Sequence, residues 1–517
     1  MTEQPMAAAL PSRPSARNLF LRLLGLVSGV AWASLLVQIE DLVGPQGLLP
    51  FPQMLQRARE IRGLAVYYEI PTLGWWLPED QALTVLGTAG LVCSGLLVLG
   101  WVPWWAVLGN WIAYLSVSTL GQTFLSFQWD ALLLETYWCS LWYAPAWNLR
   151  QPTSSPWGRR LLWLLLAKLM FLSGVTKWLS GDPVWRDGSA LLYHYATQPL
   201  PSWISWYMHQ APDWFHRGSV WMMFAIECVG PGLIVLGYWG RVIFALSTLA
   251  LMTLIHITGN YGFFNMLTAI LCIPLFERLE RRSAAPAPAD SLSTSMRVLR
   301  AQGYRWGTRF SASLAMVVIA LSFLVSLREM IRTARGDRLP AWCARLVDPL
   351  ENYVLKPMEP VILKPLAPWR SINGYGLFRV MTTKRLELVL EGSQDALHWY
   401  ELDFRYKPGA PHRAPPVVAP HMPRLDWQMW FAALNPRLQA HWLQPLLKHV
   451  LLGTPTAARL LGQPTLTAEP PPWIRLVVYE YRFTDFEYRR QTHDWWLRLR
   501  LGELTPALSQ ETWERTP

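Results

Sequence analysis

Residues 159–201 read RRLLWLLLAKLMFLSGVTKWLSGDPVWRDGSALLYHYATQPLP, and they combine a long apolar run with charged and polar groups. The part that follows Arg159 and Arg160 is long enough to cross a bilayer, which takes about 20 apolar residues. It nonetheless carries Lys168 and Lys177. An ionisable side chain at membrane depth is costly and usually faces a partner or a wet cavity. The stretch therefore predicts a membrane span whose lysines have buried partners.

The composition of the whole chain is that of a polytopic membrane protein. Of its 517 residues, 52% are hydrophobic and 16% are charged, whereas soluble domains contain about 25% charged residues. The net charge of +11 comes from scattered arginines and lysines, not from a compact basic face with an RNA or DNA motif. We therefore expect the lipid bilayer as a partner and no nucleic acid.

Sequence motifs of metal sites and of common enzymes are not found. The five cysteines form no CxxC or His/Cys metal spacing, so the sequence predicts no metal, no cofactor and no disulfide framework. It also contains no nucleophile elbow, P-loop or HExxH motif. Hydrolase, ATPase and zinc-protease functions therefore lack support.

The apolar runs predict a membrane domain at residues 18–330 with about eight or nine spans, after a disordered N-terminus at residues 1–17. The run at 124–146 is interrupted by Asp130 and Glu135, so it either crosses fully or is re-entrant. The expected spans lie at 18–39, 82–100, 103–120, 124–146, 160–179, 219–238, 241–258, 261–276 and 307–327.

Basic residues in short loops predict the orientation, because lysine and arginine are enriched on the cytoplasmic side. The N-terminal arginines and a basic loop at 277–306 are therefore expected inside, and the loops at 40–80 and 180–218 outside. Arg328 and Arg332, which follow the last span, run against this rule. The remainder of the chain is then outside as well.

Residues 340–517 are expected to form a soluble domain. Hydrophobic and polar residues alternate at 385–392, 399–406 and 474–483, which predicts strands, with a hairpin turn between the first two. Segments 424–434 and 440–452 have the pattern of helices. We expect a mostly-β, sandwich-like fold with helical additions.

The topology places Lys168 near mid-depth and seven further polar side chains towards the outer side, and all eight could converge on one outward-facing cavity. A lysine and a histidine in a dry cavity could support proton abstraction. The alternative is structural: Lys168–Glu135 and Lys177–Asp130 could be ion pairs that hold the bundle together. The eight candidates are Asp130, Glu135, Lys168, Lys177, His194, His256, Asn260 and Asn265.

The chain resembles the lipase maturation factor family over most of its length. The segments that carry the resemblance are LVQIEDLVGPQGLLP (36–50), FQWDALLLET (127–136), KLMFLSGVTKW (168–178), LLYHYATQPLP (191–201), GNYGFFNMLTAI (259–270), NGYGLFRVMT (373–382), LEGSQDALHWYELDFRYKPG (390–409) and PHMPRLDWQMWFAAL (420–434).

The resemblance implies a chaperone-like membrane factor that helps exported lipases to fold and assemble. Animal members lie in the endoplasmic reticulum membrane with a lumenal tail domain. The Ala/Leu/Arg/Pro-rich composition suggests a bacterial member, which would lie in the inner membrane with a periplasmic tail. The membrane part is also distantly similar to the transmembrane region of vitamin K-dependent γ-carboxylases, without a matching catalytic motif.

Two functions follow as hypotheses. The first is a folding factor for exported lipases or other hydrolases, with Trp427, Trp430 and Phe431 as candidate client contacts; the alternative for these residues is the core of their own domain. The second is a membrane enzyme that modifies a lipid or an exported polypeptide in the polar cavity. A transporter would favour repeated halves, and the sequence has none. Nothing in the sequence indicates an oligomeric state.

Overall fold

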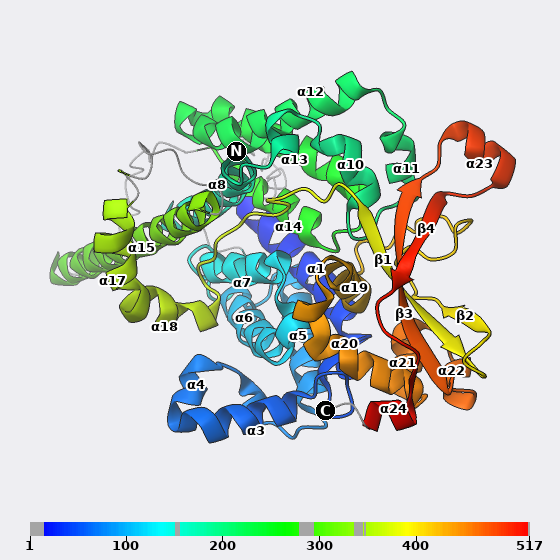
Figure 1. Ribbon diagram of the computed structural model, residues 1–517. Helices are drawn as coiled ribbons and strands as arrows, with labels where there is room; N and C mark the ends of the chain where they lie inside the picture. The colour runs from blue at the N-terminus through cyan, green and yellow to red at the C-terminus, as the bar shows by residue number, and fades with distance from the viewer. Residues whose placement is uncertain (1–14, 150–155, 279–293, 336–344, 346–347, 515–517) are drawn as a thin grey trace, which may run out of the picture.

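The computed structural model describes residues 15–149, 156–278, 294–335, 345 and 348–514. An N-terminal helical bundle and a C-terminal domain built on a β-sheet lie against each other (Figure 1). Half of the expected basic loop at 277–306, residues 279–293, lies outside the described residues, and 294–306 is helical. Residues 1–14 of the expected disordered N-terminus also lie outside them.

The first helices of the bundle pack closely because small residues face their neighbours. Helix α1 (Ala16–Leu36) lies along α5 (Ala82–Leu99), which is followed by α6 (Pro103–Leu120). A Cβ atom at Gly90 of α5 would lie 2.0 Å from the Trp32 ring of α1. Glycine at such a position lets two membrane helices approach closely. This packing holds α1 against α5, and α1 also contacts α14.

Five helices among the described residues are long and apolar enough to cross a membrane: Ala16–Leu36, Ala82–Leu99, Pro156–Leu179, Asp213–Thr258 and Ala312–Ala334. The prediction of eight or nine spans is therefore not confirmed. Helix α7 (Gln128–Leu141) has 14 residues, about 21 Å of helix, which is shorter than the ~30 Å hydrocarbon core. The segment at 264–276 is also short.

The fourth of these candidate spans contains a sharp turn. It comprises α12 (Asp213–Phe224), the π-helical turn η4 (Ala225–Val229), η5 (Gly230–Leu236) and α13 (Gly237–Thr258). Gly237 has a φ of 85°, which favours glycine. Gly230 then lies beside Phe244, so the two arms run antiparallel. Helix α14 (Phe264–Leu271) follows.

Basic side chains gather at one end of the bundle. Arg17 donates to the Leu149 carbonyl at 3.0 Å, Arg159 pairs with Glu277 at 3.1 Å, and Arg241 donates to the Leu275 carbonyl. The exposed Trp101, Trp147 and Trp239 lie in the same region, as tryptophan does at membrane interfaces. The C-terminal domain contacts the opposite end, through residues such as Gln38 and Asn260.

Short helices make up much of the two segments that we expected as outer loops. Residues 40–80 include α2 (Ile39–Val43), α3 (Phe51–Arg62) and α4 (Val66–Glu69). Residues 180–218 include α9 (Pro183–Arg186), α10 (Ala190–Thr197), α11 (Trp203–His209) and the start of α12. Helix α10 lies next to α11 and α12 and closes one end of the cavity described below.

The long helix α15 (Thr294–Arg335) connects the two parts of the molecule. It runs beside α8 (Pro156–Leu179) and ends next to the C-terminal domain, where Glu329 and Thr333 contact Arg379. Arg328, whose charge runs against the orientation rule, forms an ion pair with Glu359. Short helical turns, including α17 (Lys356–Met358) and α18 (Lys364–Leu366), lead on from it.

The C-terminal domain contains one antiparallel sheet with the strand order β2-β1-β3-β4 and with β5 paired to β3. The strands are β1 (Arg385–Ser393), β2 (Trp399–Leu402), β3 (Trp473–Phe483), β4 (Trp496–Glu503) and β5 (Leu508–Ser509). Among the described residues, a second sheet is not found, so the sandwich that we expected is wrong. Helix α19 (Arg424–Leu434) packs on β1 instead, followed by α20 (Pro436–Leu451) and α21 (Pro455–Leu461).

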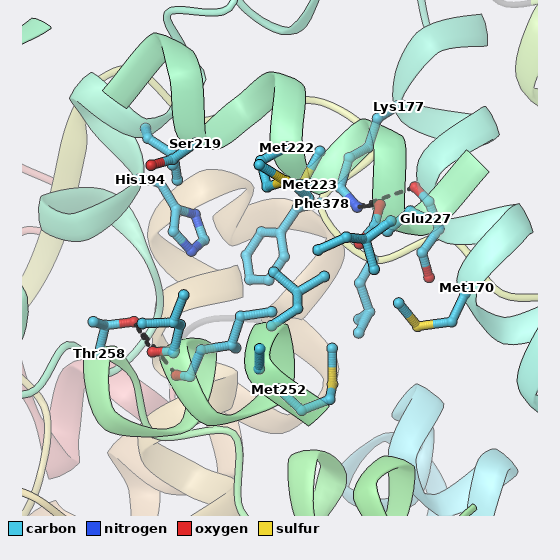
Figure 2. A pocket seen from close by; sticks show the side chains of 18 of the residues that line it. Met170, Lys177, His194, Ser219, Met222, Met223, Glu227, Met252, Thr258 and Phe378 are labelled. Atoms are coloured by element: carbon cyan, nitrogen blue, oxygen red, sulfur yellow. Dashed lines mark hydrogen bonds and ion pairs between the residues drawn. The ribbon is translucent and has the colours of Figure 1, made fainter. Parts of the chain in front are cut away.

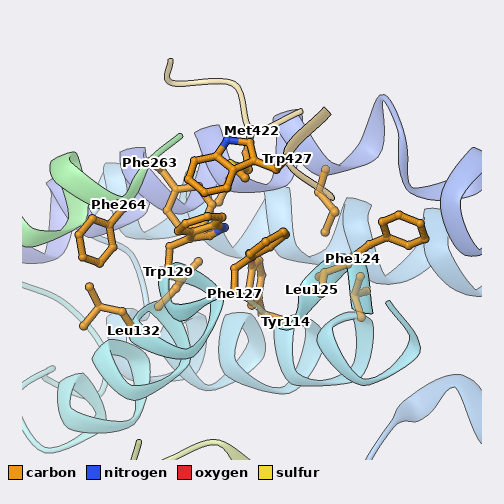
Figure 3. Close-up of a cluster of buried hydrophobic side chains, with 14 of the residues drawn as sticks. Tyr114, Phe124, Leu125, Phe127, Trp129, Leu132, Phe263, Phe264, Met422 and Trp427 are labelled. Carbon is orange, nitrogen blue, oxygen red and sulfur yellow. The ribbon is translucent and has the colours of Figure 1, made fainter. Parts of the chain in front are cut away.

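Aromatic side chains from both parts form a continuous core (Figure 3). Phe127 stacks on Trp129 with the ring centroids 4.6 Å apart, and Trp129 meets Trp427 of α19 edge to face at 4.7 Å. Such pairs add to the free energy gained by burying the rings. The bundle and the C-terminal domain therefore share a core.

Candidate functional site

A cavity of about 600 Å³ lies between α8, α12, α13 and α14 at the end of the bundle that contacts the C-terminal domain (Figure 2). Helix α10 closes it from one side. Leu377 and Phe378, from the segment before β1, cover it further, and the Phe378 carbonyl accepts a hydrogen bond from Trp185 at 3.0 Å. Most of the lining is apolar and includes Met170, Met208, Met222, Met223 and Met252.

A buried ion pair forms part of the cavity wall. The Lys177 ammonium donates to Glu227 at 2.8 Å and to the Ser173 carbonyl at 3.0 Å. Both side chains are about 6% exposed. Glu227 lies in η4, a π-helical turn of a kind often found at functional sites. Gly174 makes the contact possible, because a Cβ there would lie 2.5 Å from Cys228 Sγ.

His194 of α10 contributes a second polar group to the cavity. Its Nε2 lies 3.2 Å from the Tyr261 hydroxyl, which donates to Gln198 at 2.7 Å. The hydroxyl therefore accepts from Nε2–H, and Nδ1 carries the lone pair. Among the described residues, Nδ1 has no hydrogen-bond partner. Burial, with a smaller effect of the Lys177 charge, lowers the pKa of His194 to about 4, so the ring is neutral at pH 7.

The chemistry of the cavity favours binding over proton transfer. Lys177 is held in an ion pair with Glu227, so it does not present the free amine that a base requires. Among the described residues, no group of three or more His, Cys, Asp or Glu side chains could hold a metal ion. A mostly apolar lining with a few fixed polar groups is typical of ligand sites.

A second buried cluster joins the bundle to the C-terminal domain. Asp130 of α7 accepts from both terminal nitrogens of Arg424 at 2.7 and 2.8 Å, and from the Tyr114 hydroxyl at 2.6 Å. Arg424 also donates to the Phe124 carbonyl at 2.7 Å. The Arg424 side chain is 1% exposed and that of Asp130 is fully buried. Bidentate pairing of this kind fixes orientation as well as distance.

Glu135 forms a further contact between the domains. Lys168 pairs with it, which confirms the ion pair expected from the sequence. The other carboxylate oxygen of Glu135 accepts from the Tyr375 hydroxyl at 2.7 Å and from the Asn373 backbone at 3.0 Å. The alternative pair Lys177–Asp130 is wrong, because Asp130 is bound by Arg424 and Lys177 by Glu227.

The family assignment follows from comparison with known proteins. The model of the lipase maturation factor transmembrane domain matches residues 15–281, and that of the lipase maturation factor C-terminal domain matches residues 371–506. The chain belongs to the lipase maturation factor family. The clusters at Asp130 and Glu135 thus join the two domains that define this family.

Full-length relatives support the assignment. Lipase maturation factor 2 of Homo sapiens is 33% identical over 586 residues, which cover 95% of this chain and 82% of the relative. Lipase maturation factor 1 of Bos taurus is 30% identical over 522 residues, covering 96% and 89%. No solved structure matches the chain.

The eight candidate residues do not meet in one cavity. Lys177 and His194 line the apolar cavity, whereas Asp130, Glu135 and Lys168 lie at the junction of the two lipase maturation factor domains. Asn260 also lies at the junction, where it accepts from the backbone nitrogens of Val418 and Ala419 at 2.7 and 2.9 Å. Helix α7 carries Asp130 and Glu135, whereas α8 carries both Lys168, which pairs with Glu135, and Lys177, which pairs with Glu227.

The two remaining candidates lie outside the cavity lining. Asn265 is buried, and its side-chain amide has no partner among the described residues. His256 lies near the end of α13, and its Nδ1 has no partner there either. The structure assigns neither residue a chemical role.

The aromatic residues proposed as client contacts face the bundle. Trp427 is 3% exposed and Trp430 is 9% exposed. Their indole nitrogens donate to the carbonyls of Asn260 and Thr197. Phe431 is partly buried and packs near Phe127. This arrangement matches the alternative that these residues belong to the core.

Several important residues were not predicted. Glu227 is an acidic residue within an apolar run, the same signal that identified Lys177, and it could have been found. Arg424 and Tyr375 carry no such signal, because they do not lie in an apolar run. Arg385 of β1 was also missed; it donates to the carbonyls of Ala196 and Pro199, next to α10.

Proposed function

We propose that this protein is a membrane-anchored, chaperone-like maturation factor that assists the folding and assembly of exported lipases or other hydrolases. The observation that carries the proposal is the match to relatives named lipase maturation factors across 95% of the chain, through both domains. The geometry supports it, because the buried charges at Asp130 and Glu135 serve to join the domains.

The proposed location is a membrane that faces an export compartment. The basic end of the bundle, with Arg17, Arg159 and Arg241, would face the cytoplasm according to the charge rule. The C-terminal domain would then lie outside, in the periplasm of a bacterium or in the lumen of the endoplasmic reticulum of a eukaryote. That side is where exported lipases fold.

Strand β4 supplies a surface for a client. It is an outer strand of the sheet, and its alternate residues Leu497, Leu499 and Leu501 are exposed. An exposed sheet edge can pair with an extended chain through backbone hydrogen bonds, and the side chains on one face add apolar contact. The occupant we propose is an extended, apolar segment of a client that has not finished folding.

The direct test is the specific activity of secreted lipases in cells that lack the gene. We expect lipase polypeptide that is inactive or retained, and recovery of activity when the gene is restored. Lipase amount and activity are measured separately, so that a loss of synthesis is not mistaken for a loss of folding. Unchanged secretion and specific activity of every exported hydrolase would contradict the proposal.

A further inference from the structure

One side of the cavity is lined by residues of a candidate membrane span. Its walls on this side come from α12 and α13, both within Asp213–Thr258. Met222 and Leu254 line the cavity and are 63% and 54% exposed, and only 22% of the apolar window in this span is buried. The outer face of a membrane span lies against lipid chains. The opening between these helices therefore meets hydrocarbon.

The interior is suited to a hydrocarbon chain. Five methionines contribute to the lining, and methionine adapts its shape to irregular apolar ligands. The Lys177 charge is balanced by Glu227, and a neutral His194 adds no charge. A charged head group would thus find no unbalanced partner there, and burying it would be costly. The volume of about 600 Å³ lies within the range of ligand pockets, ~300–1,000 Å³.

The polar groups at the start of α12 suit the head group of a lipid. Ser219, labelled in Figure 2, and the exposed Trp214 lie in the first turns of α12. Both contribute to the cavity lining. Tryptophan favours the level of the lipid head groups. A lipid with its head group at this level could place one chain inwards, towards Met170 and Met252.

We propose that the cavity binds one acyl chain of a membrane phospholipid, which enters from the side between α12 and α13 while the head group stays near Ser219 and Trp214. This inference goes beyond the maturation function and can fail without affecting it. It assigns a lipid ligand to the membrane domain, whereas the client contact assigned above lies in the C-terminal domain.

Photocrosslinking tests the proposal with the full-length protein in phosphatidylcholine vesicles. The probe is a phosphatidylcholine with a diazirine near the end of one acyl chain, and labelled peptides are mapped by mass spectrometry. Met170 and Met252 are 2% and 5% exposed, so label at these residues must come from within the cavity. We expect label at both, in addition to the label on the outer surface.

A matched pair of variants separates the cavity from the surface. Ala250→Trp places a large side chain at the opening, whereas Leu246→Trp lies on the same helix but outside the lining. We expect about a tenfold loss of label at Met170 and Met252 in the first variant and no change in the second. Ser247→Phe is a second filling variant, for use if Ala250→Trp does not keep the melting temperature of the wild type.

Three outcomes would overturn the proposal. The first is the absence of label at Met170 and Met252 in the wild type. The second is equal label in the filling variant and in Leu246→Trp. The third concerns the source of the chain: label from a diazirine-bearing free fatty acid alone, tested in a parallel arm, would exclude the phospholipid.

Discussion

At the scale of single residues, the buried charges are held in pairs that cross from one segment to another. Lys177 reaches Glu227 on η4, and Asp130 reaches Arg424 on α19. Such pairs contribute little net stability compared with apolar residues, but removing one partner leaves an uncompensated buried charge. Their value here lies in specifying how the segments meet.

Asp130→Asn should therefore destabilise the protein strongly. It leaves the fully buried Arg424 without its counter-charge, and we expect a loss of about 3–5 kcal/mol in the free energy of unfolding, measured by denaturant unfolding in detergent. The control is Glu503→Gln, at a side chain that is 41% exposed and pairs with both Arg475 and Arg500, and it should cost at most about 1 kcal/mol. Equal effects of the two variants would show that the buried pair is not important.

His194 should make stability depend on pH. Burial lowers its pKa to about 4, below the ordinary value of about 6.5. Between these values the unfolded chain binds the proton that the folded protein does not, so stability falls as pH is lowered through this window. His194→Gln should remove up to about 1.4 kcal/mol per pH unit of that slope, measured as unfolding free energy from pH 4 to 8. An unchanged slope would show that His194 titrates normally in the folded state.

Single residues were predictable from the sequence only where their position in a span was unusual. Lys168, Lys177, Asp130 and Glu135 stood out as charges in apolar runs, and the pair Lys168–Glu135 was expected. The partner of Lys177 was not, because Glu227 is 50 residues further along the chain and only the packing of α8 against η4 brings the two together.

At the scale of elements, the contact between α8 and η4 depends on Gly174. A Cβ at this position would lie 2.5 Å from Cys228 Sγ and 2.9 Å from Glu227 Cβ. We expect Gly174→Ala to destabilise the protein by about 1–3 kcal/mol through overpacking. The matched control is Gly95→Ala in α5, where no atom lies within 4 Å and alanine should stabilise the helix by up to about 1 kcal/mol. The melting temperatures of the two variants are measured in the same detergent. A Gly174→Ala variant that is more stable than the wild type would contradict the close packing of α8 on η4.

Strand β4 gives a prediction about the client surface. Leu499 is 64% exposed on this outer strand, so Leu499→Glu should leave the fold intact while it weakens apolar contact with a client. We expect the specific activity of the secreted lipase to fall several-fold. Leu438→Glu on α20, at an equally exposed leucine outside the sheet, should have no effect. Full lipase activity with Leu499→Glu would show that β4 is not the contact for the client.

Elements with a clear local pattern were predicted closely, and their arrangement was not. The helix expected at 424–434 has these bounds in α19, and the strands at 385–392 and 474–483 correspond to β1 and β3. The sandwich was wrong because β1 is buried on both faces by α19 and the neighbouring segments, a packing that alternation alone does not reveal. The expected count of eight or nine spans is not confirmed, and α7, with 14 residues, is shorter than the hydrocarbon core of a bilayer.

At the scale of the whole molecule, the two domains are matched by two separate family models. In the structure they share an aromatic core and two buried polar clusters. Asp130, Glu135 and Lys168, which the sequence suggested for a polar cavity, lie in this junction. These charges therefore serve the assembly of the two domains, and we propose that maturation activity depends on that assembly.

The most direct test compares single and double variants in the lipase assay. Asp130→Asn should lower the specific activity of the secreted lipase, because Arg424 is left unpaired at the junction. The double variant Asp130→Asn/Arg424→Gln removes both charges and keeps hydrogen-bonding groups, so we expect it to recover stability and most of the lipase activity. A double variant that is as stable as the wild type yet matures no lipase would contradict the account, because Asp130 or Arg424 would then act in the chemistry itself.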